Sequence, residues 1–276
     1  MLGPFEVRTV RRRPTSLVGV LRLRDGRTGS YVDVAAHPSI PLRLCVHGPS
    51  AGAAGYGLAD VRVLLVADVL TRIAELSGLQ VTAVLTAASL PPGVLEQAAG
   101  ALGINPPAAC SDFAEAGALL GGPADVHVAG TAAGVGDHAD GVLINVGPVD
   151  DLTRGSAARA VAASDPLALR LAVLSRAYHQ PVELTEAALA EAGEVLSRWR
   201  HSVAEWACEP SRPIPEQAAR EIAAAFDEDL NTAAALATLH RMDSDHRVPA
   251  GAKFETFAFT DRVLGLELVR EIGHLR

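Results

Sequence analysis

Residues 42–55 read LRLCVHGPSAGAAG, in which a short apolar strand runs directly into a glycine-rich loop. This order, followed by a helix, is typical of a Rossmann-type unit. The helix is predicted from apolar side chains that recur at steps of three and four residues, at Val61, Leu65, Val69, Ile73 and Leu76. Ser77-Gly78 is expected to end it, because glycine tolerates a left-handed conformation.

Strands and helices continue to alternate beyond this unit. The further elements expected are strands at 81–85, 126–129 and 142–146, and helices at 91–102 and from Asp112 to about Gly121. The alternation predicts an α/β fold with a Rossmann-like, doubly wound parallel sheet. Such sheets bind ligands at the carboxyl ends of their strands, so we expect a site in the loop 47–57.

The chain divides into two predicted domains. Residues 1–150 form the Rossmann-like domain, with an N-terminal β-hairpin that turns at Asp25-Gly26 and docks on a sheet edge. No strand pattern follows Pro148, so residues 151–276 are predicted to form an α-helical bundle domain. One of its helices carries Trp199 and Trp206 on a single apolar stripe, which favours core packing over a cofactor box. Residues 226–232 place short polar side chains ahead of another helix, where capping is favoured over a binding role.

Charge and composition exclude several classes of protein. The 276-residue chain has a net charge of −8, and its one basic run is Arg11-Arg12-Arg13, which disfavours nucleic-acid binding. No uninterrupted run of about eighteen apolar residues or signal-peptide pattern is present, so a cytoplasmic protein without membrane contact is expected. Cys45, Cys110 and Cys208 are widely separated, which predicts reduced thiols. Cys45 is expected to be a buried structural thiol rather than a nucleophile.

Five short stretches carry a family resemblance. Residues 44–49 read LCVHGP, 67–72 read ADVLTR, 165–171 read DPLALRL, 178–185 read YHQPVELT and 229–232 read DLNT. In order and spacing they resemble the class I cysteinyl-tRNA synthetases and the mycothiol-pathway cysteine ligases. The resemblance implies a shortened paralogue of an ATP-dependent, adenylate-forming ligase, with a HUP-type fold and a helical region. The sequence stops where a cysteinyl-tRNA synthetase continues into its anticodon-binding domain, so tRNA is not expected to bind through such a domain.

Two motifs that act on the triphosphate in this family are replaced. Aligned on Asp68, the position of the His-Ile-Gly-His motif reads Gly57-Leu58-Ala59-Asp60, and Asp60 favours the helix but repels a triphosphate. The position of the Lys-Met-Ser-Lys-Ser loop falls within 141–151, which contains no lysine. Lys253 is the one lysine of the chain. These departures imply degenerate catalytic motifs, and no catalytic residue is assigned.

The family also implies a zinc ion, held by two cysteines, a histidine and a glutamate. His47 stands at the first cysteine position, and the segment of the second cysteine is missing between Leu120 and Asp125. His47, His138 and Asp140 are the one candidate assembly, against the alternative that both histidines are ordinary loop residues. We therefore expect no intact zinc site.

The leading hypothesis is a pseudoenzyme that keeps the scaffold, has lost cysteine activation and acts as a binding or partner subunit. Its ligand would be ATP or a nucleoside, and its partner a protein or a small molecule. A divergent aminoacyl ligase or aminoacyl-transfer enzyme of a specialised pathway is the alternative, and a tRNA-acceptor-binding protein is weaker because the chain is acidic. The glycine-rich loop could hold a phosphate or simply make a turn. The candidate nucleotide-binding residues are His47, Gly48, Pro49, Ser50, Gly55, Gly57 and Asp60.

Overall fold

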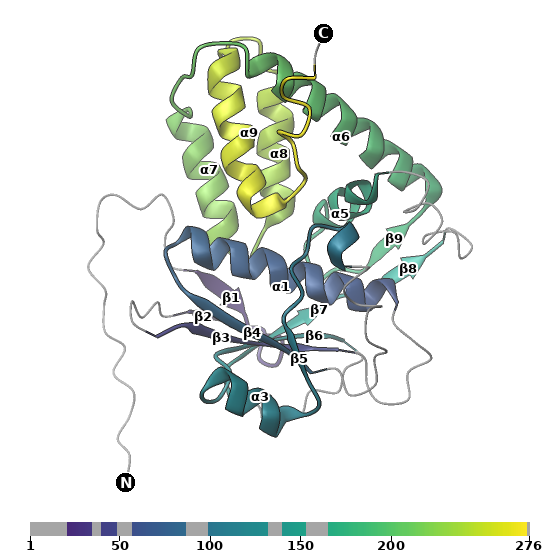
Figure 1. Cartoon of the computed structure of the whole chain (residues 1–276), viewed down its shortest axis with the longest axis vertical. Helices are drawn as coiled ribbons and strands as arrows, with labels where there is room; N and C mark the ends of the chain where they lie inside the picture. Colours follow the sequence, from purple (N-terminus) through teal and green to yellow (C-terminus); the bar gives the residue numbers. More distant parts are fainter. Residues whose placement is uncertain are drawn as a thin grey trace.

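A five-stranded parallel sheet organises the first half of the chain (Figure 1). The computed structural model describes residues 21–34, 40–48, 57–86, 99–131, 140–152 and 165–274. The strands are β3 (Leu42–His47), β4 (Val81–Thr86), β5 (Ala108–Cys110), β6 (Val126–Gly130) and β7 (Val142–Val146), in the order β5-β4-β3-β6-β7. The predicted parallel α/β sheet is confirmed, and β5 is an additional strand that the sequence pattern does not indicate.

Helices cover both faces of this sheet, as Figure 1 shows for α1 and α3. On the face of α1 (Leu58–Leu76), Leu44 and Val46 of β3 belong to the main hydrophobic core. On the face of α3 (Phe113–Leu120), Cys45 of β3 lies in a second core cluster. Successive side chains of a strand point to opposite faces, so the continuous apolar run of β3 is buried on both sides. The sheet is therefore doubly wound, as predicted.

Capping residues fix the ends of these helices. The Asp112 carboxylate accepts a hydrogen bond from Glu115 N at 2.9 Å and starts α3, and Gly121 ends it with φ +69°. Gly78 follows α1 with φ +82°. Glycine adopts this left-handed backbone without the steric cost of a Cβ atom. The predicted ends are confirmed. Of the helix expected at 91–102, residues 99–102 are described, and 99–101 are helical.

The N-terminal hairpin docks on an edge of the sheet. β1 (Arg22–Arg24) and β2 (Tyr31–Asp33) pair antiparallel, and the turn between them contains Gly26. Gly26 N donates to Leu143 O on the edge strand β7 at 2.7 Å. The hairpin and its place at a sheet edge are therefore as predicted.

Strand structure continues past Pro148, and the expectation of helices alone beyond that point is wrong. β8 (Val149–Asp151) pairs in parallel with β9 (Val182–Leu184), so the expected boundary near 150 falls inside a strand. Each strand has three residues, too few to show an alternating pattern. The pairing partner also lies far along the chain, where local sequence gives no indication of it.

Arg62 of α1 holds the segments next to β8 and β9 against this helix through hydrogen bonds. Its buried guanidinium donates to the carbonyl oxygens of Gly147 (2.9 Å), Pro148 (3.1 Å), Ala177 (3.0 Å) and Gln180 (2.6 Å). Burial lowers the pKa of Arg62 to about 10, so the side chain stays protonated at neutral pH. One cation thus orders both the turn after β7 and the turn before β9.

Helices dominate the second half, in the upper part of Figure 1. They are α5 (Pro166–Leu174), α6 (Glu186–Trp206), α7 (Glu216–Asp227), α8 (Thr232–Ser244) and α9 (Ala250–Leu264). Trp199 and Trp206 both pack on the ring of Phe257, with ring centroids 5.4 and 5.1 Å apart, so the tryptophan stripe is core packing as predicted. Asn231 caps α8 by accepting a hydrogen bond from Ala234 N at 3.0 Å. No helix in the described ranges combines the length and apolar character that a membrane span needs.

Arg170 of α5 joins the two halves of the chain. Its fully buried guanidinium donates to Asp68 Oδ2 on α1 at 2.6 Å. It also donates to the backbone oxygens of Leu102 (2.9 Å) and Leu264 (2.5 Å). A buried arginine whose donors meet a carboxylate and two carbonyls is a satisfied charge, so α1, α5 and the end of α9 are held at one point.

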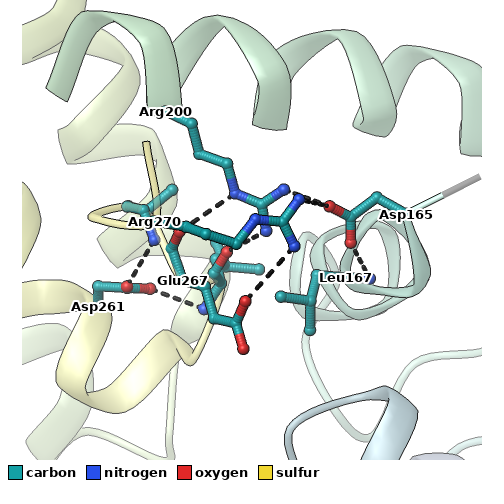
Figure 2. Close-up of polar contacts among 8 residues, drawn as sticks. Asp165, Leu167, Arg200, Asp261, Glu267 and Arg270 are labelled. Carbon is teal, nitrogen blue, oxygen red and sulfur yellow. Dashed lines mark hydrogen bonds and ion pairs between the residues drawn. The ribbon is translucent and has the colours of Figure 1, made fainter. Parts of the chain in front are cut away.

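A second polar cluster holds the segment that follows α9 (Figure 2). Asp165 caps α5 by accepting a hydrogen bond from Leu167 N at 3.0 Å, and it pairs with Arg200 of α6 and with Arg270. Arg200 also donates to Leu266 O at 2.7 Å. The C-terminal turn is therefore tied to both α5 and α6.

Candidate functional site

The described part of the predicted site lies at the carboxyl end of the sheet. β3 ends at His47, and Gly48 N donates to Thr86 O of the neighbouring β4 at 2.9 Å. Gly57 and Asp60 stand at the start of α1. Of the other candidates, Pro49, Ser50 and Gly55 lie outside the described residues. The Gly48 N–H, one expected phosphate donor, is thus already engaged inside the sheet.

Asp60 occupies the start of α1 with its own carboxylate. Its Oδ2 accepts a hydrogen bond from Gly57 N at 2.8 Å, and Asp60 N donates to Gly57 O at 3.1 Å. The first turn of a helix has free N–H groups and the positive end of the helix dipole, which together stabilise an anion. An internal anion therefore stands at the place where a bound phosphate would gain most from the helix.

His47 forms a pair with His127, a residue that the sequence reasoning did not select. His47 Nε2 lies 3.0 Å from His127 Nδ1 across the neighbouring strands β3 and β6, and both side chains are buried. His127 Nε2 lies 2.9 Å from Asp140 O. A carbonyl oxygen can only accept, so His127 Nε2 carries the proton and His127 Nδ1 accepts from His47.

Burial keeps both imidazoles of this pair neutral. Desolvation, reinforced by His127, lowers the pKa of His47 to about 4. Desolvation is also the largest influence on His127 and lowers its pKa, although the hydrogen bond to the Asp140 carbonyl opposes it. At neutral pH the pair therefore offers nitrogen lone pairs but no positive charge for a phosphate.

Cys45 completes a group of three side chains that can bind a metal. One ligand atom each from Cys45, His47 and His127 lies within 4.8 Å of the others, and all three residues are buried. This group differs from the expected assembly of His47 with His138 and Asp140. Asp140 meets His127 through its backbone carbonyl, and His138 lies outside the described residues. The alternation of Cys45 and His47 along one strand was the signal that could have identified the first two members.

Lys253, the one lysine of the chain, lies in the helical half and not at the sheet. Lys253 is buried on α9, where its Nζ donates to Asp243 O at 2.8 Å and lies 5.2 Å from the ring centroid of Trp206. Residues 142–146 and 149–151 form β7 and β8. The segment that aligns with the lysine-rich loop of the resembled family is thus largely built into strands and has no lysine.

Comparisons with known proteins point to one group of ligases, although no family model matches the chain. An L-cysteine:1D-myo-inositol 2-amino-2-deoxy-alpha-D-glucopyranoside ligase of Streptomyces griseus is 38% identical over 108 residues, 38% of this chain and 25% of that protein. A cysteine–tRNA ligase of Paracoccus denitrificans is 43% identical over 108 residues, 38% of this chain and 20% of the ligase. One of Xylella fastidiosa is 38% identical over 89 residues, 32% of this chain and 18% of the ligase. The chain spans a quarter or less of the length of these relatives.

Proposed function

This chain is related to the cysteine–tRNA ligases and the L-cysteine:1D-myo-inositol 2-amino-2-deoxy-alpha-D-glucopyranoside ligases, and we propose that it is a non-activating member of that group. In this proposal the chain keeps the fold as a binding or partner protein and has lost the ATP-dependent activation of cysteine.

The carboxylate of Asp60 at the start of α1 is the observation that carries the proposal. Gly57 N donates to it at 2.8 Å, so the helix N-terminus already holds a negative group. A triphosphate that approached this turn would meet a like charge in place of donors that stabilise developing charge. The same residue stabilises the fold and opposes adenylation.

Three further observations support the proposed loss of activation. The donor of Gly48 is engaged with Thr86 O, and the buried imidazoles of His47 and His127 are neutral, so neither supplies positive charge at the strand ends. The chain's one lysine is committed to α9. Stabilising a departing pyrophosphate needs preorganised positive charge, and the described residues of this edge do not contribute it.

Retention of the scaffold supports a binding or partner role. The Arg62 contacts hold α1 to the turns before β8 and β9, and the Arg170 contacts hold it to α5 and α9, through charged side chains that are buried. Leaving a buried charge without its partners is costly, so these contacts favour keeping the whole arrangement. A fold maintained in this way, without the charges that adenylation needs, is consistent with a role in binding.

Pyrophosphate exchange into ATP with the full chain tests the proposal. We expect no cysteine-dependent exchange above the blank, with a cysteine–tRNA ligase assayed in parallel as the positive control. A thermal-shift panel with ATP, cysteine, adenosine and cysteinyl-sulfamoyl-adenosine then separates binding from chemistry, because a ligand that binds the folded state raises its apparent stability. Robust exchange with cysteine, or with any other amino acid, would overturn the proposal and favour the divergent-ligase alternative.

A further inference from the structure

The three side chains of Cys45, His47 and His127 lie on one face of the sheet. Cys45 and His47 are two residues apart on β3, so they point to the same side. Cys45 is the register partner of His127 on β6, which brings the third side chain beside them. α3 covers this face, and His47 packs against Phe113 with ring centroids 5.2 Å apart. The group is therefore positioned by the sheet itself.

The hydrogen bonds of His127 prepare it as a metal ligand. Its Nε2–H donates to Asp140 O at 2.9 Å, which fixes the ring orientation and leaves the Nδ1 lone pair facing His47 and Cys45. Histidine ligands of metal sites commonly donate their second ring N–H to a carbonyl or carboxylate in this way, and the contact increases the basicity of the ligating nitrogen. His127 thus has its outer hydrogen bond in place.

Two imidazole nitrogens and one thiol sulfur form a donor set that fits zinc. Zinc accepts both nitrogen and sulfur ligands in a tetrahedral arrangement, with Zn–S bonds of about 2.3 Å and Zn–N bonds of about 2.0 Å. These lengths place neighbouring ligand atoms roughly 3.3–3.6 Å apart. The His47 and His127 nitrogens are 3.0 Å apart, and all three ligand atoms lie within 4.8 Å, so side-chain adjustments of about an ångström would form the site.

We propose that Cys45, His47 and His127 bind one zinc ion at this face of the sheet. Binding replaces the hydrogen bond between the two imidazoles: His127 ligates through Nδ1 and His47 through Nε2, and the His47 proton moves to Nδ1. The Cys45 thiol gives its proton to solvent as the S–Zn bond forms. The three protein ligands leave one tetrahedral position for an exogenous ligand. This set shares only His47 with the cysteine-rich set that the family resemblance implies.

Cys45 is buried, so its thiolate is costly unless a cation pairs with it. A coordinated metal ion stabilises the thiolate directly and offsets the desolvation. The zinc site does not depend on the loss of adenylation, because none of its ligands is needed to place Asp60 at α1.

Cobalt titration of the full chain, after metal removal with a chelator, tests this site. Co²⁺ takes the coordination of Zn²⁺ and reports a sulfur ligand through a thiolate charge-transfer band in the near ultraviolet. We expect one Co²⁺ per chain with this band, and its displacement by one equivalent of Zn²⁺. Zinc affinity is then measured by competition with a chromophoric chelator, and Cu⁺ is titrated separately as the competing soft ion.

Variants assign the ligands. Cys45→Ala should abolish the charge-transfer band, and His127→Ala should weaken zinc binding by more than about 100-fold, because even outer contacts of a metal site are commonly worth about 10- to 100-fold. Cys208→Ser is the matched control, since Cys208 is an exposed free thiol and its removal should change neither the band nor the affinity. Circular dichroism and thermal unfolding verify that each variant is folded.

The wild-type protein decides the outcome even if a variant does not fold. Absence of stoichiometric Co²⁺ or Zn²⁺ binding would overturn the site and leave His47 and His127 as a buried hydrogen-bonded pair. Stoichiometric Cu⁺ binding without Zn²⁺ binding would overturn zinc as the occupant. Loss of the band in Cys208→Ser but not in Cys45→Ala would show that exposed thiol chemistry produced the signal. Pyrophosphate exchange remains a separate measurement, so failure of one proposal is distinguishable from failure of the other.

Discussion

Replacing Asp60 by asparagine separates its two opposing effects. The amide oxygen can still accept the 2.8 Å hydrogen bond from Gly57 N, whereas the negative charge at the start of α1 is lost. Loss of the charge–dipole interaction should lower the free energy of unfolding by about 0.3–1 kcal/mol. A phosphate about 4 Å from the carboxylate is repelled by about 1 kcal/mol in water and by about 4 kcal/mol near a protein surface. Removing this repulsion should strengthen ATP binding by at least about fivefold.

Calorimetry with ATP and with adenosine, on the wild type and on Asp60→Asn, measures this effect. Adenosine carries no phosphate, so its affinity should change little while that of ATP rises. Asp60→His, which also supplies a donor, should act in the same direction. Glu75→Gln removes an equal charge from the last turn of α1, about 22 Å along the helix, and should leave both affinities unchanged. Equal changes for ATP and adenosine in Asp60→Asn, or no binding of either ligand, would refute the reasoning.

Two further predictions concern the buried charges and the histidine pair. Arg170→Met should lower the free energy of unfolding in urea by about 3–5 kcal/mol because it leaves Asp68 and two carbonyls short of a donor, whereas Arg220→Ala, at an exposed i,i+4 pair, should cost less than about 0.5 kcal/mol. Similar losses of stability in both variants would contradict the role of Arg170 in holding α1, α5 and the end of α9 together. The pKa of His47 is about 4 in the folded protein and about 6.5 in an unfolded chain. Between these two values the unfolded state binds more protons than the folded state, so the free energy of unfolding should fall as the pH drops from about 6.5 to about 4. Urea unfolding from pH 7 to pH 4 should show a smaller decline in His47→Gln than in the wild type, and the exposed His201→Gln should behave as the wild type does. An unchanged slope in His47→Gln would show that the pair does not titrate as described.

Local sequence patterns predicted the elements whose causes are local. The apolar run of β3, the three- and four-residue spacing of α1 and the Asp112 and Gly121 ends of α3 all depend on neighbouring residues, and the structure has them as expected. β5, β8 and β9 have three residues each and show no periodicity, so their pairing is set by distant partners. The same distinction holds at the site: His47 was found from its strand end, but His127 joins it only through the register of β3 and β6.

Several residues of the resembling stretches serve the scaffold in this structure. Asp68 pairs with Arg170 across the joint between α1 and α5. Tyr178 OH and Arg24 N both donate to Asp229 Oδ1, at 2.6 and 2.9 Å, which ties the N-terminal hairpin to the helical half. Asp229 holds this position with φ +59°, a left-handed backbone that costs energy for a residue other than glycine and persists where the surrounding contacts require it.

This division between scaffold and site bears directly on function. Similarity at residues that hold the fold gives no evidence about chemistry, which has to be argued from the site. The described site has a carboxylate at the start of α1 and, on the α3 face of the sheet, a neutral, buried set of one thiol and two imidazoles. Such a set carries no positive charge for a triphosphate, but its nitrogen and sulfur donors suit a thiophilic metal ion. In our two proposals the fold of a cysteine-ligase relative persists while adenylation is lost and a metal ion binds at the sheet, and pyrophosphate exchange and metal titration test these two points independently.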